Sequence, residues 1–298
     1  MAAAALSHSL SLLLIALVVD AVLGWLPGLR EVLRAPADAI TVLAAWLDRR
    51  LNRERRSPST RFMRGLIVAL VIAAAGWGIG WLVRNFAATG PEPESSVVEA
   101  AAILLLIRER APFDLARGIA RHMGADDFGA ARSAIEDLAI GFAGVVGGAF
   151  WYLLLGLPGL CLYRAVQVTA RRIARPGVVF GRGAAALNAA LDVIPATIAG
   201  LLIALAAVFA PRGRPLHALA VMCRDRTKHP TWNTGAAMPA MAGALGFALG
   251  GGPWIGDGRA RLVAQDVRSA SYLYAVACLI HMGLIAGAFA ALSPYSPI

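Results

Sequence analysis

Long stretches without a single charged side chain constrain this sequence more than any other feature. Gly65–Val83 lies between Arg64 and Arg84 and contains no Asp, Glu, Lys or Arg. A helix needs about 20 mostly apolar residues to cross a bilayer. Further runs of suitable length are Leu138–Tyr163, Val193–Pro211 and Ser269–Ile298, which carry no charge, and Met1–Leu29, in which Asp20 is the only charge. The sequence therefore predicts an all-α, polytopic membrane protein with about five spans.

The composition supports this class, because 58% of the residues are hydrophobic and only 15% are charged. Soluble domains usually carry about 25% charged residues, so a water-soluble globular enzyme is excluded as the default, and so is a disordered chain. The net charge of +10 rests almost wholly on arginine, with Lys228 as the one lysine. Arginines that flank membrane spans explain this charge. We expect the lipid bilayer as a partner and no nucleic acid.

Histidines and cysteines give no metal motif. The five histidines show no HxxxH spacing, and Cys161, Cys223 and Cys278 form no CxxC pair. Two of the cysteines lie in apolar runs, where cysteine acts as a small hydrophobic residue. Neither a metal site nor a disulfide framework is predicted.

The first apolar run predicts a retained helix rather than a secretory signal, because no basic residue precedes it and the first one, Arg30, follows it. Residues 27–64 carry nine arginines, which places this connection in the cytoplasm. Residues 211–271 also carry eight basic groups, but five spans in simple alternation would place this segment on the side of the membrane opposite the cytoplasm. The exact topology therefore stays open.

Two segments predict broken or re-entrant helices. Gly156-Leu157-Pro158-Gly159 interrupts the run Leu138–Tyr163, and Gly235–Gly252 is rich in Gly and Ala with Pro239 inside. Irregular backbone is tolerated at membrane depth only where protein or water satisfies its polar groups. Between two of the spans, the apolar periodicity of residues 112–137 predicts an amphipathic helical hairpin. We expect this hairpin to pack on the rest of the chain, so that residues 1–298 form a single integral-membrane domain.

Ionisable and small residues inside the spans have a functional and a structural interpretation. His281 and Asp20 are intramembrane ionisable groups and so candidate functional residues. A helix–helix hydrogen bond is the favoured explanation of His281, and Asp20 lies close enough to a span end to reach the interface. Three glycine pairs have GxxxG spacing, which favours close helix packing: Gly76 and Gly80, Gly144 and Gly148, and Gly246 and Gly250.

The most informative polar stretch is 224–261. It combines the cations Arg224, Arg226, Lys228 and Arg261 with His229, Asn233 and many glycines. Cationic side chains and glycine-rich backbone could bind a phosphorylated substrate. A basic loop attracted to anionic lipid is the alternative interpretation. The residue types alone do not separate the two.

At this stretch the sequence resembles the CobD/CbiB family, the membrane adenosylcobinamide-phosphate synthases of cobalamin biosynthesis. His229, Asn233, Gly235 and the run Ala240–Gly246 resemble the family segment His-Arg-Ser-Pro-Asn-Ala-Gly…Ala-Met-Ala-Gly-Ala-Leu-Gly. Further matching pieces occur in the same order along the chain: Asp48–Arg53, Ala130–Arg132, Leu157–Gly159, Tyr163–Val166, Phe180–Arg182, Ile194–Ala196 and Trp254–Gly258. The resemblance covers most of residues 15–270.

The resemblance implies an ATP-dependent amide bond between adenosylcobyric acid, a corrinoid, and an aminopropanol or its phosphate. It implies ATP and Mg²⁺ as cofactors and a multi-pass location in the bacterial inner membrane. The substrate-binding candidates that it suggests are Arg182, Lys228, His229, Asn233, Gly235 and Asp257. No catalytic residue can be named from it.

Several acidic or amide positions of the family pattern carry other residues here. Gln167, Ala170, Asn188, Ala189 and Met238 stand where the family has Asn, Asp or Glu. Carboxylates at these places would be the natural Mg²⁺ ligands and proton acceptors. Two hypotheses therefore remain: a divergent synthase, or a non-catalytic membrane paralogue that acts as a binding or assembly partner of another membrane protein. A small transporter has less support, because few spans carry an ionisable residue.

Overall fold

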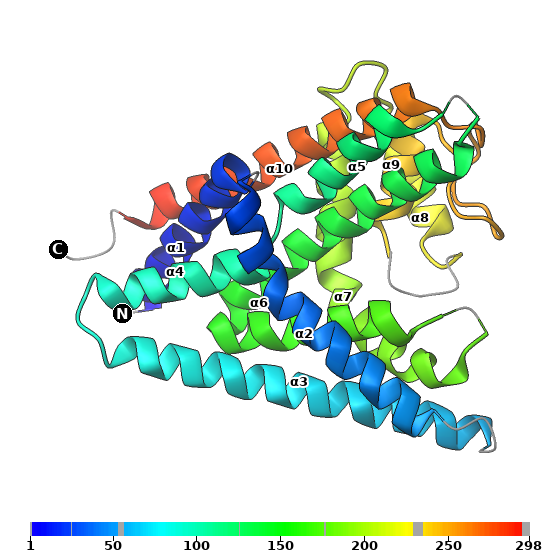
Figure 1. Cartoon of the computed structure of the whole chain (residues 1–298). Coiled ribbons are helices and arrows are strands. Elements are labelled where there is room, and N and C mark those ends of the chain that lie inside the picture. Colours follow the sequence, from blue (N-terminus) through cyan, green and yellow to red (C-terminus); the bar gives the residue numbers. More distant parts are fainter. Residues whose placement is uncertain are drawn as a thin grey trace. The chain divides into compact units, whose positions relative to one another are not determined.

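The computed structural model describes residues 2–24, 26–52, 57–124, 126–175, 177–228 and 235–293. Over these ranges the regular structure is α-helical, with two isolated β-bridges and no strand (Figure 1). The helices are α1 (Ala2–Leu23), α2 (Pro27–Leu51), α3 (Pro58–Ala88), α4 (Glu94–Leu106), α5 (Arg110–His122), α6 (Phe128–Ile173), α7 (Val179–Ala206), α8 (Pro215–Asp225), α9 (Ala237–Leu245) and α10 (Ala264–Leu292). This confirms the all-α class.

Five of the described helices are long and apolar enough to cross a membrane. They are α1, α3, α6, α7 and α10, and each covers one of the apolar runs found in the sequence. Large apolar side chains such as Ile79, Leu82 and Leu279 point outward from them. Water would not solvate such surfaces favourably, whereas lipid does. The chain is therefore a polytopic helical membrane protein.

The chain forms two compact units. Unit 1 comprises Met1–Arg108, Gly147–Leu191 and Ile285–Ile298, and unit 2 comprises Glu109–Val146 and Asp192–Leu284. The helices α6, α7 and α10 each contribute residues to both units. The single integral-membrane domain expected from the sequence stays a prediction.

Glycines allow close helix contacts inside unit 1. A Cβ on Gly80 would lie 2.7 Å from Pro158 Cα, and one on Gly76 would lie 2.9 Å from the Cys161 carbonyl oxygen, so α3 packs backbone to backbone on α6. The GxxxG pair Gly76 and Gly80 thus has the predicted packing role. The pair Gly246 and Gly250 does not, because both residues lie beyond the end of α9 and have positive φ.

The helix α6 breaks where the sequence predicts a breaker. Gly156 has φ 70° and ψ −159°, and Pro158 follows it in the next turn. Towards the other end, α5 and the first turns of α6 form the expected helical pair at 112–137. The second helix of this pair does not end there, because the apolar periodicity continues without a stop signal into the span.

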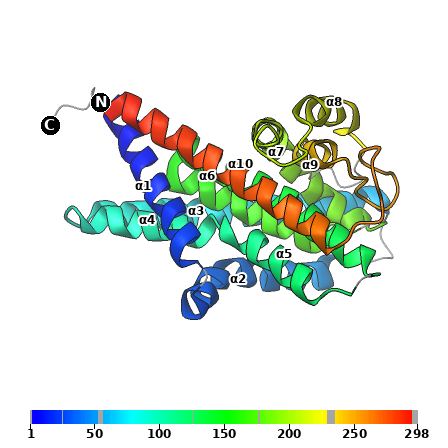
Figure 2. The same cartoon turned by 90° about the horizontal axis from the view of Figure 1, so that it is seen from above.

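Unit 2 is built around the short helix α9, whose nine residues are almost entirely buried. Figure 2 shows α8 and α9 side by side, with α7 next to them. A Cβ on Gly200 of α7 would lie 2.6 Å from the Met222 sulfur of α8. Gly246 ends α9 with φ 67°, a left-handed conformation that glycine adopts without strain. The apolar segment 235–252 is therefore one short buried helix followed by a loop.

His281 of α10 is buried in unit 2. Its ring lies edge-on to Phe142, with 6.3 Å between the ring centroids. Its Nδ1 has no hydrogen-bond partner among the described residues, so this atom makes no helix–helix hydrogen bond there. Asp20 is also buried, which differs from the exposed position that a side chain reaching the interface would have.

Candidate functional site

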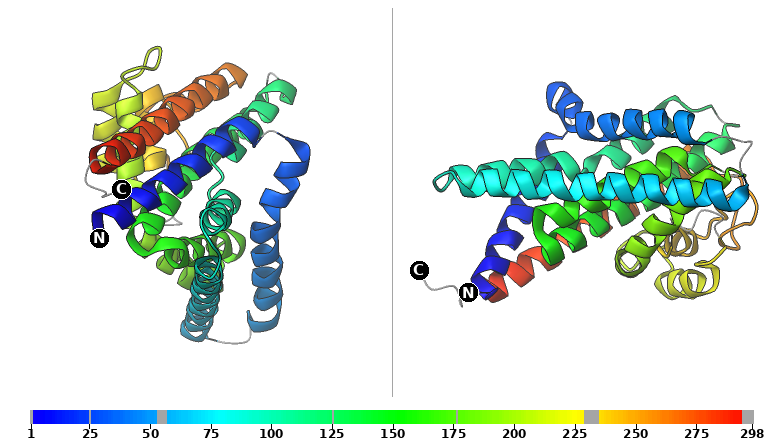
Figure 3. Two further views of the ribbon diagram at one scale, coloured as in Figure 1. Left: turned by 90° about the vertical axis from the view of Figure 1, so that its left-hand side faces the viewer. Right: turned by 90° about the horizontal axis from the view of Figure 1, so that it is seen from below.

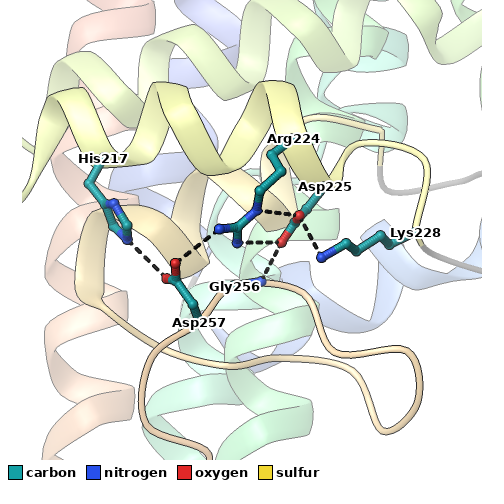
Figure 4. Close-up of polar contacts among 6 residues, drawn as sticks. All are labelled: His217, Arg224, Asp225, Lys228, Gly256 and Asp257. Atoms are coloured by element: carbon teal, nitrogen blue, oxygen red, sulfur yellow. Dashed lines mark hydrogen bonds and ion pairs between the residues drawn. The ribbon is translucent and has the colours of Figure 1, made fainter.

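The structure joins two of the six predicted site residues in one polar cluster of unit 2. Lys228 and Asp257 are linked through Arg224 and Asp225 (Figure 4). Gly235 lies just before α9 with φ 36°. Arg182 is an exposed residue of α7 in unit 1. His229 and Asn233 lie outside the described residues.

Asp225 is the centre of this cluster. Its carboxylate is 0% exposed and accepts two hydrogen bonds from Arg224, from Nε at 2.7 Å and from Nη2 at 3.0 Å. The Lys228 ammonium lies 2.7 Å from Asp225 Oδ1, and the backbone N–H of Gly256 donates to Oδ2 over 2.8 Å. A buried carboxylate is stable only when it is paired in this way. Asp225 therefore connects the end of α8 to a loop that follows α9.

Asp257 forms the outer part of the same cluster. Its carboxylate is 50% exposed and accepts a hydrogen bond from Arg224 Nη1 at 3.0 Å. His217 lies two helical turns before Arg224 on α8, and its Nε2 is 3.1 Å from the other oxygen of Asp257. Figure 4 shows Arg224 between the two carboxylates, with its guanidinium directed at both. Arg224 thus uses Nε, Nη1 and Nη2 within the protein.

This arrangement shifts the acid–base equilibria of the paired groups. Hydrogen bonds from Arg224 and Lys228 hold the pKa of Asp225 well below its usual value, and the Gly256 N–H acts in the same direction. Arg224, and to a smaller extent His217, lowers the pKa of Asp257. The same pairs raise the pKa of Arg224. Both carboxylates are therefore ionised at neutral pH.

The cations suggested for phosphate binding thus differ in availability. Arg224 donates from Nε, Nη1 and Nη2 to the two carboxylates. Lys228 has three ammonium hydrogens and points one of them at Asp225. Arg226 and Arg261 are exposed and make no hydrogen bond or ion pair within the described residues. Arg224 is itself 47% exposed and keeps one further N–H on each of Nη1 and Nη2, so an anion at this cluster could meet Arg224 as well as Lys228.

The loop after α9 folds back on itself and needs glycine to do so. Leu249 and Ile255 exchange backbone hydrogen bonds of 2.8 and 3.0 Å, and the Arg259 N–H donates to the Gly246 oxygen over 3.1 Å. A Cβ on Gly258 would lie 1.9 Å from that same oxygen. The two arms of the loop therefore touch backbone to backbone.

Arg132 and Glu136 of α6 hold the loop from another side. Arg132 donates to the carbonyl oxygens of Gly250 and Ala260, each over 3.2 Å, and Glu136 accepts the Gly250 N–H over 2.7 Å. The Arg132 guanidinium also lies 4.6 Å from the centre of the Trp254 ring. The i,i+4 spacing of Arg132 and Glu136 puts both on one helix face. The first turns of α6 thus fix the loop as well as packing in the core.

Asp266 at the start of α10 makes a third attachment. It accepts the Val263 N–H over 2.8 Å and pairs with Arg259 at 2.5 Å. A carboxylate in the first turn of a helix also interacts favourably with the helix dipole. The loop 246–263 is therefore attached to α8, α6 and α10 by charged or polar side chains from each of these helices.

The sequence singled out Lys228 and Asp257 but not Asp225 or His217. The signal for Asp225 was present, since an acid between Arg224, Arg226 and Lys228 in one short segment favours local ion pairing. The partner of His217 lies 40 residues away, so nothing local indicated it. In the described part of the chain, no group of three or more His, Cys, Asp or Glu residues could hold a metal ion.

A family model and the similar curated proteins point to the same family. The family model described as CobD/Cbib protein matches residues 142–274, a range that contains α7, α8, α9 and the loop after α9. The chain is 30% identical to "Cobalamin biosynthesis protein CobD" of a Sinorhizobium species, over 93% of this chain and 97% of the relative. It is 28% identical to the protein of that name from Brucella melitensis, over 94% and 96%.

A protein with the same name from Rhodobacter capsulatus is 30% identical over 81% of this chain and 82% of its own length. No solved structure gives a significant match. The relatives are aligned over nearly their full length, so the similarity extends well beyond the polar cluster.

Proposed function

Because this chain belongs to the CobD/CbiB family, we propose that it acts in cobalamin biosynthesis as a membrane protein of the adenosylcobinamide-phosphate synthase type. It would join an aminopropanol or its phosphate to adenosylcobyric acid through an amide bond. The relatives named for cobalamin biosynthesis are aligned end to end with this chain. The bacterial inner membrane is the proposed location, in keeping with the five apolar helices.

The observation that carries the proposal is the attachment of Lys228 to the turn at Gly256 and Asp257. Asp225 contacts both, so the segment that leads into His229 and Asn233 begins beside the loop 246–263. The sequence resemblance is most specific in these two segments. Bringing them together produces a polar surface with exposed cations, which suits the anionic part of a phosphorylated substrate.

ATP and Mg²⁺ are proposed on the family resemblance alone, and the cluster described above does not fit the metal. Asp225 has no exposed surface, and its oxygens already accept from Arg224, Lys228 and Gly256. Both oxygens of Asp257 contact cationic or imidazole nitrogens. Mg²⁺ needs carboxylate oxygens that are free to coordinate it. We therefore assign no metal ligand in this cluster and derive no step through a metal.

Complementation tests the proposal. The chain is expressed in a bacterial strain that lacks its own synthase, and conversion of cobyric acid to cobinamide phosphate is assayed together with growth on cobyric acid. We expect both to be restored. The variant Asn233→Ala should abolish conversion. Gly251→Ala is the matched control, because a Cβ on Gly251 meets nothing within 4 Å and should leave conversion unchanged.

The second candidate, a non-catalytic membrane paralogue, is favoured by one observation. Both carboxylates of the cluster are consumed by internal ion pairs, which stabilise a fold but offer no base to the reacting groups. A paralogue would fail to complement while the protein is present in the membrane in normal amounts. It would still retain a labelled corrinoid, or copurify with another membrane protein of the pathway. Restored conversion would exclude this candidate.

A further inference from the structure

The helix α2 has two apolar faces, although its composition does not qualify it as a membrane span. One face is buried in unit 1. Ala44 belongs to the core cluster around Val68, Ala69 and Phe180, and the neighbours of Ala44 on the same face pack against that cluster: Ile40, Leu47 and Leu51. This inner face holds α2 along the first half of α3 (Figure 3).

The second face points outward and is exposed. Its members recur at intervals of three or four residues: Val32, Ala35, Ala39, Val42, Leu43 and Trp46. At about 100° per residue they occupy an arc of roughly 100° on the helix surface. Val42 is 68% exposed, and Leu43 and Trp46 are each 45% exposed. A large apolar arc of this kind marks a contact surface.

The position of α2 relates this outer arc to the membrane. Ala44 shares a core cluster with Val68 and Ala69, which lie inside the charge-free segment 65–83 of α3. At the same level of α3, Val71 is 59% exposed and faces away from the core. Val42 and Leu43, next to Ala44 in the helix, therefore stand level with the membrane-facing surface of α3.

Arginines surround the end of this arc. The Arg50 guanidinium lies 4.9 Å from the centre of the Trp46 ring. Arg61 donates to the Asn52 side-chain oxygen over 3.0 Å, and Arg64 donates to the Leu51 carbonyl oxygen over 3.5 Å. Tryptophan beside arginine, directly after an apolar stretch, is typical of the membrane–water interface. The positive charge at this level complements anionic lipid headgroups.

We propose that the outer arc of α2 from Ala39 to Trp46 rests in the membrane lipid, with Arg49, Arg50, Arg61 and Arg64 in an anionic headgroup layer. The arginine-rich connection between the first two spans is then not a loop in water, and unit 1 holds this part of α2 beside the first turns of the α3 span. Lipid explains the arc better than a second copy of the chain, because arginines around a shared apolar face would repel their counterparts across such an interface.

Spin labelling of the full-length protein tests this proposal independently of any enzymatic activity. Cys161, Cys223 and Cys278 are replaced by alanine, and single cysteines are introduced as Val42→Cys, Ser59→Cys and Val71→Cys. The protein is reconstituted in phosphatidylethanolamine–phosphatidylglycerol vesicles. Nitroxide power saturation then compares oxygen, which concentrates in lipid, with a water-soluble nickel complex. Val71→Cys is the lipid reference, and Ser59→Cys is the water-side control, because Ser59 is exposed and precedes Arg61 and Arg64 at the start of α3.

We expect the label at position 42 to favour oxygen as the label at 71 does, and the label at 59 to favour the nickel complex. Replacing phosphatidylglycerol by phosphatidylcholine should shift the label at 42 towards the nickel complex, since the arginines lose their anionic partners. Preferential access of the nickel complex to position 42 in both vesicles would overturn the proposal. So would exclusion of both reagents with disulfide cross-linking between two copies at position 42.

Discussion

Gly256 donates its backbone N–H to the carboxylate of Asp225 over 2.8 Å, although the two residues lie 31 positions apart in the sequence. The same carboxylate holds the Lys228 ammonium at 2.7 Å. One buried acid therefore determines where the end of α8 lies relative to the loop after α9. Both segments belong to the part of the chain in which the family resemblance is strongest.

Removing the Asp225 charge should destabilise the cluster. In Asp225→Asn, Arg224 and Lys228 lose their buried partner, and charge-assisted hydrogen bonds of this kind contribute about 2 kcal/mol. We expect a lower thermal midpoint in detergent and faster hydrogen exchange at the Gly256 amide. Asp266→Asn is the matched control, because Asp266 also accepts one backbone N–H and pairs with one arginine. Equal exchange rates at Gly256 in both variants would contradict a specific role for Asp225.

Stability should depend on pH through the same acid. The pKa of Asp225 in the folded protein is lowered, first by Arg224, so its ionised form stabilises the fold above its ordinary pKa of about 4. That stabilisation is lost as the pH falls through and below this range. Asp225 should leave the thermal midpoint unchanged between pH 7 and 5. Below about pH 4 the midpoint should fall, and it should fall less in Asp225→Asn than in the wild type. A decline of the same size in both proteins would assign it to other acids.

Glycines of the loop differ in what they tolerate. In Gly258→Ala, the new Cβ would lie 1.9 Å from the Gly246 carbonyl oxygen, so the two arms of the loop must separate. Overpacking of this type costs about 1–3 kcal/mol. We expect a reduced yield of folded protein and a lower thermal midpoint. Gly251→Ala, in the same loop but with open space around it, should behave as the wild type.

The contact between α3 and α6 provides a comparable test inside the membrane part of unit 1. Gly80→Ala would place a Cβ 2.7 Å from Pro158 Cα, whereas Gly78→Ala meets nothing within 4 Å. Both changes favour helix formation equally, since each replaces glycine by alanine. The thermal midpoint in detergent should fall for Gly80→Ala and stay the same or rise for Gly78→Ala. A fall of equal size in both variants would show that packing on α6 is not the cause.

Several features were predictable because they depend on local sequence. The five apolar helices follow from run length and charge, since a long apolar segment has few alternatives to a membrane-spanning helix. The break at Gly156 follows from a local Gly-Pro pattern. The second helix of the 112–137 pair was only partly predicted, because no stop signal separates it from the span and it continues as α6. The prediction that Gly246 and Gly250 form a helix-packing pair was wrong, because their spacing does not reveal that α9 has already ended.

Composition, run length and motifs were enough to predict a helical membrane protein, the five segments long and apolar enough to cross a membrane, and the family that the chain resembles. The use of the charges in 224–261 could be read only from the packed structure. Arg224 stands among the cations in the sequence, yet its guanidinium is occupied by Asp225 and by Asp257, 33 residues away. The reason is physical: a buried carboxylate must find cationic and N–H partners, and which partners it finds depends on how α8 and the loop are packed, not on their spacing in the chain.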